Sequence, residues 1–253
     1  METELNTFKR LVIVGATSAI AEHCARFWVA GAAIEMTLIG RDAARLERVA
    51  ADLRVRGAAS HITTMTSGFQ TSADIERTVE AVYAAGPVDL VLIAHGMLPD
   101  QSACEEDLAS TQEALEINGL SPVLFAEAFA RRLARQQQAG TIALIGSVAG
   151  DRGRKSNYVY GAAKGLVDRY AQGLQHRFAG TAVKVVLIKP GPTATPMTAH
   201  MQGTKMASVE AVAHQIIKAI AAGKSTVYAP GKWRLIMLII RHLPAFVFNK
   251  LNI

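Results

Sequence analysis

Cysteine is scarce in this chain: only Cys24 and Cys104 occur among 253 residues, in dissimilar contexts and without metal-ligand spacing. Both are expected to be reduced, which excludes a disulfide-stapled secreted domain and gives no reason to expect a metal site. The polar amino terminus, METELNTFKR, lacks the apolar segment of a signal peptide. No basic helix or basic-aromatic interleaving is present, so nucleic acid is not an expected partner. These absences favour a cytoplasmic protein, with the inner face of the membrane as the alternative location.

Apolar residues, in contrast, make up half of the sequence, which is enough to bury a large core. Short apolar runs alternate with helical patterns, with no linker or low-complexity break. The alternation predicts one α/β domain over residues 1–253, a doubly wound, Rossmann-like parallel sheet with helices on both faces. Strands are expected near residues 11–14, 34–39, 62–66, 88–94, 142–145, 183–188 and 225–228, and helices up to residue 30, over 43–56, 72–85, 108–137 and 208–222, and through Tyr160.

Tyr160 and Lys164, in the sequence YGAAK, are expected to lie one turn apart on the same face of a helix. A neighbouring ammonium favours the phenolate, so we expect Lys164 to lower the pKa of Tyr160 and make it a usable acid or base. Ser147 follows the apolar strand 142–145 and is expected at the carboxyl edge of the sheet, where open α/β sheets bind ligands. Together these three residues are predicted to be catalytic.

The segment GATSAIA, residues 15–21, follows the first strand and opens the next helix. A turn of this kind offers backbone N–H groups and a helix N-terminus to a pyrophosphate. The segment contains one glycine where dinucleotide loops usually have three, so an ordinary strand-to-helix turn is the alternative. The predicted cofactor-binding residues are Gly15, Thr17, Ser18, Ala19 and Ile20.

The second strand ends in Gly40 and Arg41, at the place where an NAD site would carry a carboxylate for the ribose. Arg41 could pair with a 2′-phosphate, so NADP(H) is preferred over NAD(H); the alternative is a solvated arginine at a helix start. The fourth strand leads into Ala94, His95 and Gly96, which are also predicted to contact the cofactor. His95 is expected to hydrogen-bond the cofactor, to titrate near neutrality, or to be merely structural.

Two further segments complete the predicted site. Asn118 is a helix-breaking amide amid apolar residues, and a water-binding role in a proton path explains it better than packing does. The segment KPGPTATPM after the sixth strand is a stiff loop at the carboxyl edge, where cofactor contact is expected. Its predicted cofactor-binding residues are Pro190, Gly191, Thr193 and Thr195.

These motifs occur in the order and spacing of the short-chain dehydrogenase/reductase family, which the chain resembles over residues 9–230. The resemblance implies a seven-stranded sheet and hydride transfer to or from a nicotinamide. It also implies that Tyr160 is the acid/base, that Ser147 holds the substrate oxygen and that Asn118 positions a relay water. Lys164 would lower the pKa of the tyrosine and, with Tyr160, contact the cofactor. A homodimer or homotetramer formed through the helices that carry Asn118 and Tyr160 is also implied.

The segments on either side of the Tyr160 helix bear on the substrate. Arg152, Arg154 and Lys155 are expected at the rim of the site, either as a solvated surface or as a recognition site for an anionic substrate group. The tail, residues 232–253, has apolar runs interrupted by charge and proline, which fall short of a spanning helix. This tail suits peripheral contact with a membrane interface, but it could equally pack in a subunit interface or over the active site.

The GATSAIA loop, the stretch before Tyr160 and the tail resemble a subgroup that contains decaprenylphosphoryl-2-keto-ribose reductase. That resemblance implies NADPH-dependent reduction of a keto-sugar linked to a polyprenyl phosphate, or of a comparable lipidic ketone. The alternatives are a 3-oxoacyl or other small-ketone reductase, and a noncatalytic membrane-associated subunit that retains the dinucleotide fold.

Overall fold

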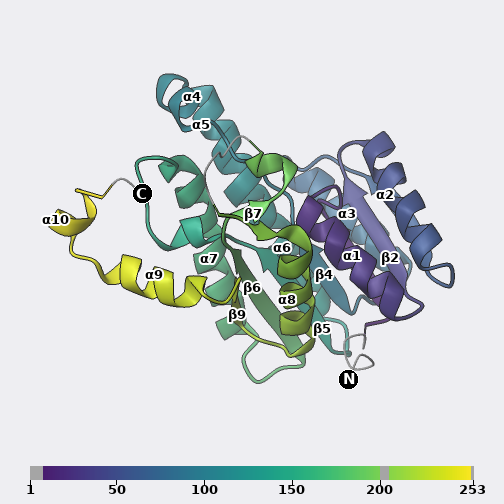
Figure 1. Cartoon of the computed structure of the whole chain (residues 1–253). Helices are drawn as coiled ribbons and strands as arrows, with labels where there is room; N and C mark the ends of the chain where they lie inside the picture. The colour runs from purple at the N-terminus through teal and green to yellow at the C-terminus, as the bar shows by residue number, and fades with distance from the viewer. Residues whose placement is uncertain (1–7, 200–204, 252–253) are drawn as a thin grey trace.

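The computed structural model describes residues 8–199 and 205–251 of the chain. Its centre is a seven-stranded parallel sheet in the order β3-β2-β1-β4-β5-β6-β9, which confirms the predicted doubly wound fold (Figure 1). The strands are β1 (Arg10–Val14), β2 (Glu35–Gly40), β3 (His61–Thr66), β4 (Leu90–Ile93), β5 (Gly140–Ile145), β6 (Val183–Pro190) and β9 (Thr226–Ala229). Two short strands, β7 (Thr193–Ala194) and β8 (Ala207–Ser208), form a separate small sheet.

Helices cover both faces of the sheet because the central strands are apolar on both sides. On one face, one hydrophobic cluster joins the strands to α1 (Ala19–Gly31), α2 (Ala43–Arg56) and α8 (Val209–Ala221). On the other face, a second cluster joins them to α3 (Ser72–Ala84), α6 (Ser121–Leu133) and α7 (Tyr158–Arg177). Two short helices, α4 (Gln101–Glu106) and α5 (Leu108–Leu115), lie between β4 and α6 in the chain.

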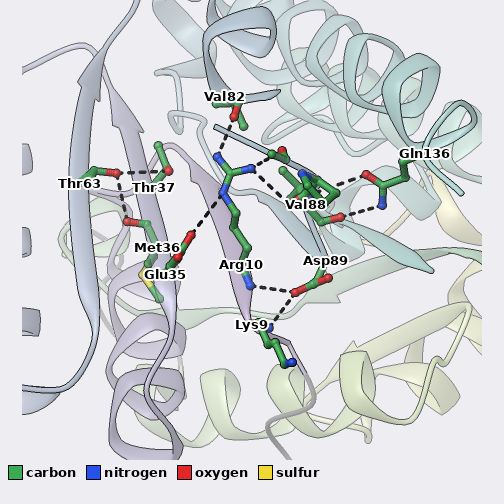
Figure 2. Close-up of polar contacts among 12 residues, drawn as sticks. Lys9, Arg10, Glu35, Met36, Thr37, Thr63, Val82, Val88, Asp89 and Gln136 are labelled. Carbon is green, nitrogen blue, oxygen red and sulfur yellow. Dashed lines mark hydrogen bonds and ion pairs between the residues drawn. The ribbon is translucent and has the colours of Figure 1, made fainter. Parts of the chain in front are cut away.

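Polar contacts join the elements at the amino end of β1 (Figure 2). The Asp89 carboxylate accepts from the backbone N–H groups of Lys9 and Arg10, each at 2.8 Å. The Arg10 guanidinium donates to Val82 O at 2.7 Å and lies 3.7 Å from Glu35. These contacts join β1 to α3, to β2 and to the segment before β4. The polar side chains at the amino end of β1 therefore stabilise the fold.

The helix predicted over residues 108–137 is interrupted and ends early. A π-helical turn, η2 (Glu116–Leu120), separates α5 from α6, and Asn118 lies in this turn with its side-chain amide donating to Ala114 O at 2.9 Å. An amide that bonds the helix backbone in this way stabilises an irregular turn. α6 ends at Leu133 because the chain then turns back, with the Gln136 amide donating to Val88 O at 2.9 Å (Figure 2).

The carboxyl-terminal tail forms two helices, α9 (Trp233–His242) and α10 (Ala245–Phe248). In Figure 1 they extend beyond the β9 edge of the sheet, coloured yellow. Met237 is the buried residue of α9, whereas Leu235, Leu238 and Ile239 are exposed. Among the helices that the structure describes, none is both long and apolar enough to cross a membrane.

Candidate active site

A cavity of about 410 Å3 lies at the carboxyl edge of the sheet, beside the ends of β1, β2 and β4. This edge is the usual ligand-binding position of a doubly wound sheet. Most of the predicted cofactor residues line the cavity: Gly15, Thr17, Ser18, Ala19, Ile20, Arg41, His95, Gly96 and Thr195. The cavity therefore joins the GATSAIA loop, the end of β2 and the loop after β4 into one site.

Gly15 makes the closest backbone approach in the cavity wall. Its φ is +81°, and a Cβ at this position would lie 2.5 Å from His95 N. Only glycine fits both the backbone conformation and the space, so the single glycine of the loop has a strict structural role. Ser18 precedes α1 and makes no side-chain capping bond. The first N–H groups of α1 have no carbonyl within the helix and are open to an anion in the cavity.

The end of β2 presents two arginines to the same cavity. Arg41 lies where sequence reasoning placed it, and Arg45, one turn further along, is also in the lining. Asp42 also lines the cavity, and its carboxylate caps α2 by accepting from Arg45 N at 3.0 Å. The end of β2 therefore offers two guanidinium groups that could pair with a phosphate.

His95 lies in the cavity wall and packs against two aromatic rings. Its ring centre is 4.7 Å from that of Phe69 and 5.7 Å from that of Phe125, and its Nε2 lies 2.9 Å from the Ser121 hydroxyl. Burial, together with the positive charges of Lys164 and Arg41, lowers the pKa of His95 to about 3. The interpretation in which His95 titrates near neutrality is therefore wrong, and the ring is a neutral part of the cavity wall.

Asn118 is fully buried and fixes the loop after β4. Its Oδ1 accepts from Met97 N at 2.8 Å while its Nδ2 donates to Ala114 O. A Cβ at Gly96 would lie 2.9 Å from Asn118 Oδ1 and 3.6 Å from Lys164 Nζ. Gly96 thus lets Asn118 and Lys164 approach the same point. The relay role of Asn118 stays a prediction.

Ser147, Tyr160 and Lys164 come together at the end of β5 and the start of α7. Ser147 is buried and caps a short 3-10 turn, η3 (Val148–Asp151), by accepting from Ala149 N at 3.1 Å. Lys164 is buried, donates to Ile145 O at 3.1 Å, and lies 5.8 Å from the centre of the Tyr160 ring. The structure thus brings the three residues together as the spacing predicted.

The pKa of Tyr160 differs from the expectation. Burial raises it, and a hydrogen bond with Ser147 opposes that shift. Lys164 does not overcome the burial, since its ammonium lies over the ring face and bonds a backbone carbonyl. The predicted lowering by Lys164 is therefore wrong for this structure, and Tyr160 is a protonated phenol at neutral pH, the form of a proton donor.

The loop after β6 contacts the cavity at one end. Thr195 is in the lining, with Pro196 and Met197 after it. Pro190, Gly191 and Thr193 lie outside the lining, as do Ala94, Tyr160 and Lys164. The hydroxyl of Thr193 donates to Gly191 O at 2.8 Å, and a Cβ on Gly191 would lie 2.0 Å from Trp233 Nε1. The Thr193 bond stabilises the loop, and Gly191 leaves room for Trp233 of the tail to pack against it.

The predicted basic rim is divided between two environments. Arg152 donates to Ile240 O at 2.6 Å and Leu243 O at 2.7 Å, and its guanidinium lies 3.8 Å from the centre of the Phe248 ring. It therefore anchors the tail. Arg154 is half-buried with its Nε atom unpartnered within the described part of the chain, and Lys155 is exposed. Only these two remain candidates for binding an anionic substrate group.

Several cavity residues were not found from the sequence. Arg45 had a signal, because it lies in the first turn of α2, four residues after Arg41. Pro196 and Met197 close the KPGPTATPM loop, for which cofactor contact was predicted without naming them. The others come from segments without a recognisable motif: Glu22, Phe69, Gln70, Ile117 and Ser121.

The cavity fits a nicotinamide dinucleotide. His95 Nδ1 is buried and has no hydrogen-bond partner within the described residues, which leaves a polar atom for a ligand in the wall. The Gly15 turn and the amino end of α1 suit a pyrophosphate, and Arg41 with Arg45 suits a further phosphate.

Comparison with known proteins agrees with this geometry. The family model for short chain dehydrogenases matches residues 9–206. An uncharacterized oxidoreductase from Streptomyces coelicolor is 31% identical over 243 residues, 96% of each chain. A galactitol 2-dehydrogenase (L-tagatose-forming) from Cereibacter sphaeroides is 30% identical over 193 residues, covering 75% of this chain and 73% of that one.

Solved structures share the fold at lower identity. A short chain dehydrogenase from Burkholderia cenocepacia in complex with NADP has a TM-score of 0.82 at 16% identity, over 98% of this chain and 99% of that one. A 3-oxoacyl-[acyl-carrier protein] reductase from Brucella melitensis in complex with NAD has a TM-score of 0.78 at 20% identity, over 90% and 98%. The chain belongs to the short-chain dehydrogenase/reductase family and is an NAD(P)-dependent oxidoreductase.

Proposed function

We propose that the protein is an NADPH-dependent carbonyl reductase that interconverts a ketone and a secondary alcohol. The observation that carries this proposal is the placement of Ser147, Tyr160 and Lys164 at the end of β5, next to a cavity that fits a dinucleotide. Asn118, whose Oδ1 lies beside Gly96 as the Lys164 ammonium does, completes the proposed catalytic set.

Tyr160 acts as the proton donor to the carbonyl oxygen, because burial keeps its phenol protonated at neutral pH. Ser147 donates a second hydrogen bond to the same oxygen, and the two hydroxyl groups stabilise the negative charge that develops there. The Lys164 ammonium stabilises the phenolate left after proton transfer and holds the ribose. When bound, the nicotinamide supplies the hydride, so one hydride and one proton convert C=O to CH–OH.

NADPH is the proposed cofactor because both Arg41 and Arg45 reach the part of the cavity at the end of β2. Asp42, the carboxylate that could bind a ribose diol, is committed to the cap of α2. Two guanidinium groups at this place favour a 2′-phosphate.

The proposed substrate is a keto-sugar on a polyprenyl phosphate, or a comparable lipidic ketone. Arg154 supports a substrate that carries an anionic group. Its guanidinium is half-buried, and its Nε has no hydrogen-bond partner within the described residues. The exposed apolar residues of α9 support a lipidic group, because the tail is seated on the loop at Gly191, beside the site. The galactitol dehydrogenase relative adds support for a polyol-type carbon skeleton.

The proposed function predicts NADPH oxidation with lipid-linked ketoses at a kcat/KM at least tenfold above that for small ketones. A 3-oxoacyl thioester is measured as the alternative substrate. Replacing NADPH by NADH tests the preference for the phosphorylated cofactor. Turnover of small ketones alone would contradict the lipid proposal and favour a small-ketone reductase. Preference for the thioester would favour a 3-oxoacyl reductase. No turnover with intact NADPH binding would favour a noncatalytic dinucleotide-binding subunit.

We further propose that the tail contacts an anionic membrane surface. Leu235, Leu238 and Ile239 are 64%, 53% and 56% exposed on one side of α9, and Phe246 on α10 is 72% exposed. Residues 211–253 contain six of the 27 basic residues and none of the 21 acidic ones. The formal charge of +6 therefore resides in residues 211–253, which include the tail. An apolar stripe flanked by positive charge is the pattern of a helix that lies in a membrane interface.

Vesicles with and without phosphatidylglycerol test this contact. The intact protein is expected to sediment with the anionic vesicles at low salt and to be released as salt rises. Replacing Leu235, Leu238 and Ile239 by Gln should abolish sedimentation, whereas Val55→Gln, at a still more exposed apolar residue of α2, should not. Equal binding of both variants, or none by the intact protein, would contradict the proposal.

A second copy of the chain is the proposed partner of the apolar groove between α5 and α7. Its lining includes Leu108, Leu115, Leu120 and Leu166, all exposed, together with the small residues Ala162 and Ala163. These two alanines allow close helix approach, so pairing α5 and α7 with their symmetry mates would bury the leucines. A single-chain mass by light scattering would rule out the homodimer or homotetramer.

A further inference from the structure

Four charged side chains lie together behind the proposed catalytic residues. Lys189 on β6 forms ion pairs with Asp151 on η3 and Asp168 on α7, and the exposed fractions of these three side chains are 4%, 4% and 6%. Tyr228 on β9 donates to Asp151 Oδ2 at 2.9 Å. Lys164, one helical turn before Asp168, is the fourth charged residue.

Asp168 is packed directly against the segment that carries Ser147. A Cβ at Gly146 would lie 2.9 Å from Asp168 Oδ1, and a Cβ at Gly150 would lie 2.9 Å from Asp168 Oδ2. The two glycines on either side of Ser147 thus make room for this carboxylate. Removing it would leave the segment without its buried support on α7.

Asp168 also balances the charge of Lys164. The Lys164 ammonium is 3% exposed and its hydrogen bond goes to a neutral carbonyl, Ile145 O. A buried ammonium without a counter-charge is strongly disfavoured. Asp168 Oδ2 bonds Lys189, while Oδ1 is buried without a hydrogen-bond partner within the described residues. The carboxylate therefore lies between two lysines and compensates both.

We propose that Asp168 is a positioning residue of the active site, which keeps Lys164 charged and holds the Ser147 segment against α7. This inference rests on the proposed function only for the catalytic role of Lys164. Asp151 is the control residue. It also forms an ion pair with Lys189, but it lies in the η3 turn and accepts from Tyr228. Replacing Asp151 therefore disturbs the charged cluster without removing the counter-charge of Lys164.

The ionisable groups around Lys164 define the pH range in which the arrangement operates. They are Tyr160 and Asp168 on α7, His95 after β4 and, beyond Asp168, Lys189 and Asp151. Burial lowers the pKa of Lys164 to about 8 and Asp168 opposes this shift, whereas burial raises the pKa of Asp168 to about 6 against the effect of Lys189. Both charges therefore coexist between about pH 6 and pH 8.

The test is an NMR titration of lysine labelled with 13C at Cε, in which Lys164→Met assigns the signal. Asp168→Asn removes the charge with little change in shape, so the titration midpoint of Lys164 should fall by about one pH unit. Asp151→Asn should leave that midpoint unchanged although it also breaks an ion pair with Lys189. Should Asp168→Asn not fold, Asp168→Ser is smaller, equally uncharged and expected to give the same shift.

An unchanged midpoint in the Asp168 variants, or equal shifts in the Asp151 and Asp168 variants, would overturn the inference. This readout needs no substrate, so failure of the proposed reductase function would leave it interpretable. Where turnover is measurable, the alkaline limb of its pH profile should move to lower pH in Asp168→Asn and stay in place in Asp151→Asn.

Discussion

Tyr160→Phe is expected to reduce NADPH-dependent turnover by about 10²–10⁴-fold, the usual contribution of a positioned proton donor. The variant keeps the ring that packs near Lys164 and loses only the hydroxyl that bonds Ser147. NADPH binding, followed by the change in nicotinamide fluorescence, should therefore change little. The measurement is kcat from the loss of absorbance as NADPH is oxidised.

Tyr158→Phe is the matched control for Tyr160→Phe. Tyr158 begins the same helix, two residues earlier, and is 45% exposed. Its hydroxyl has no role in the proposed mechanism, so turnover should stay within about twofold of the parent. A normal rate for Tyr160→Phe would overturn the assignment of the proton donor, and equal losses in both variants would indicate a general structural effect.

Gly15→Ala is expected to lower the free energy of unfolding by about 2 kcal/mol or more, because alanine would be forced to a positive φ at a crowded site. The new Cβ would lie 2.5 Å from His95 N, so either the Gly15 turn or the loop after β4 must move. Both segments line the cavity, and NADPH affinity should fall at least tenfold with the stability. Thermal unfolding and a fluorescence titration with NADPH measure the two effects.

Gly173→Ala is the control for Gly15→Ala and is expected to stabilise the protein rather than destabilise it. Gly173 is exposed in α7, and a Cβ there would meet nothing within 4 Å. Alanine in a helix interior is more stable than glycine by up to about 1 kcal/mol, so the melting temperature should rise. A Gly15→Ala variant as stable as the parent, with unchanged NADPH affinity, would contradict the argument from backbone geometry.

The predictions that agree with the structure depend on local pattern and on strand order. Apolar runs predicted the strands because buried parallel strands are apolar on both faces. Ser147 could be placed near Tyr160 because a strand end and the next helix of a doubly wound sheet meet at the same edge. Arg41 could be placed in the cavity for the same reason, since it follows β2 directly.

The interpretations that failed depend on burial. The pKa of Tyr160 was expected to fall because Lys164 is one turn away, but spacing does not reveal that the hydroxyl is desolvated. Arg152 was expected either at a solvated surface or at an anionic substrate group, whereas its guanidinium donates to backbone carbonyls about 90 residues later in the chain. The π-helical turn at Asn118 depends on a side-chain bond to Ala114 O that periodicity does not show.

The sequence alone determined the fold class, the edge of the sheet that carries the site and the chemistry of its reactive side chains, because these follow from periodicity, chain order and residue type. Only the tertiary structure decided which charges are paired. Lys189, Asp151 and Asp168 come from three separate elements and meet behind Lys164, and Arg152 meets α9 and α10. Such pairings arise from burial between distant segments, and burial is a property of the packed chain.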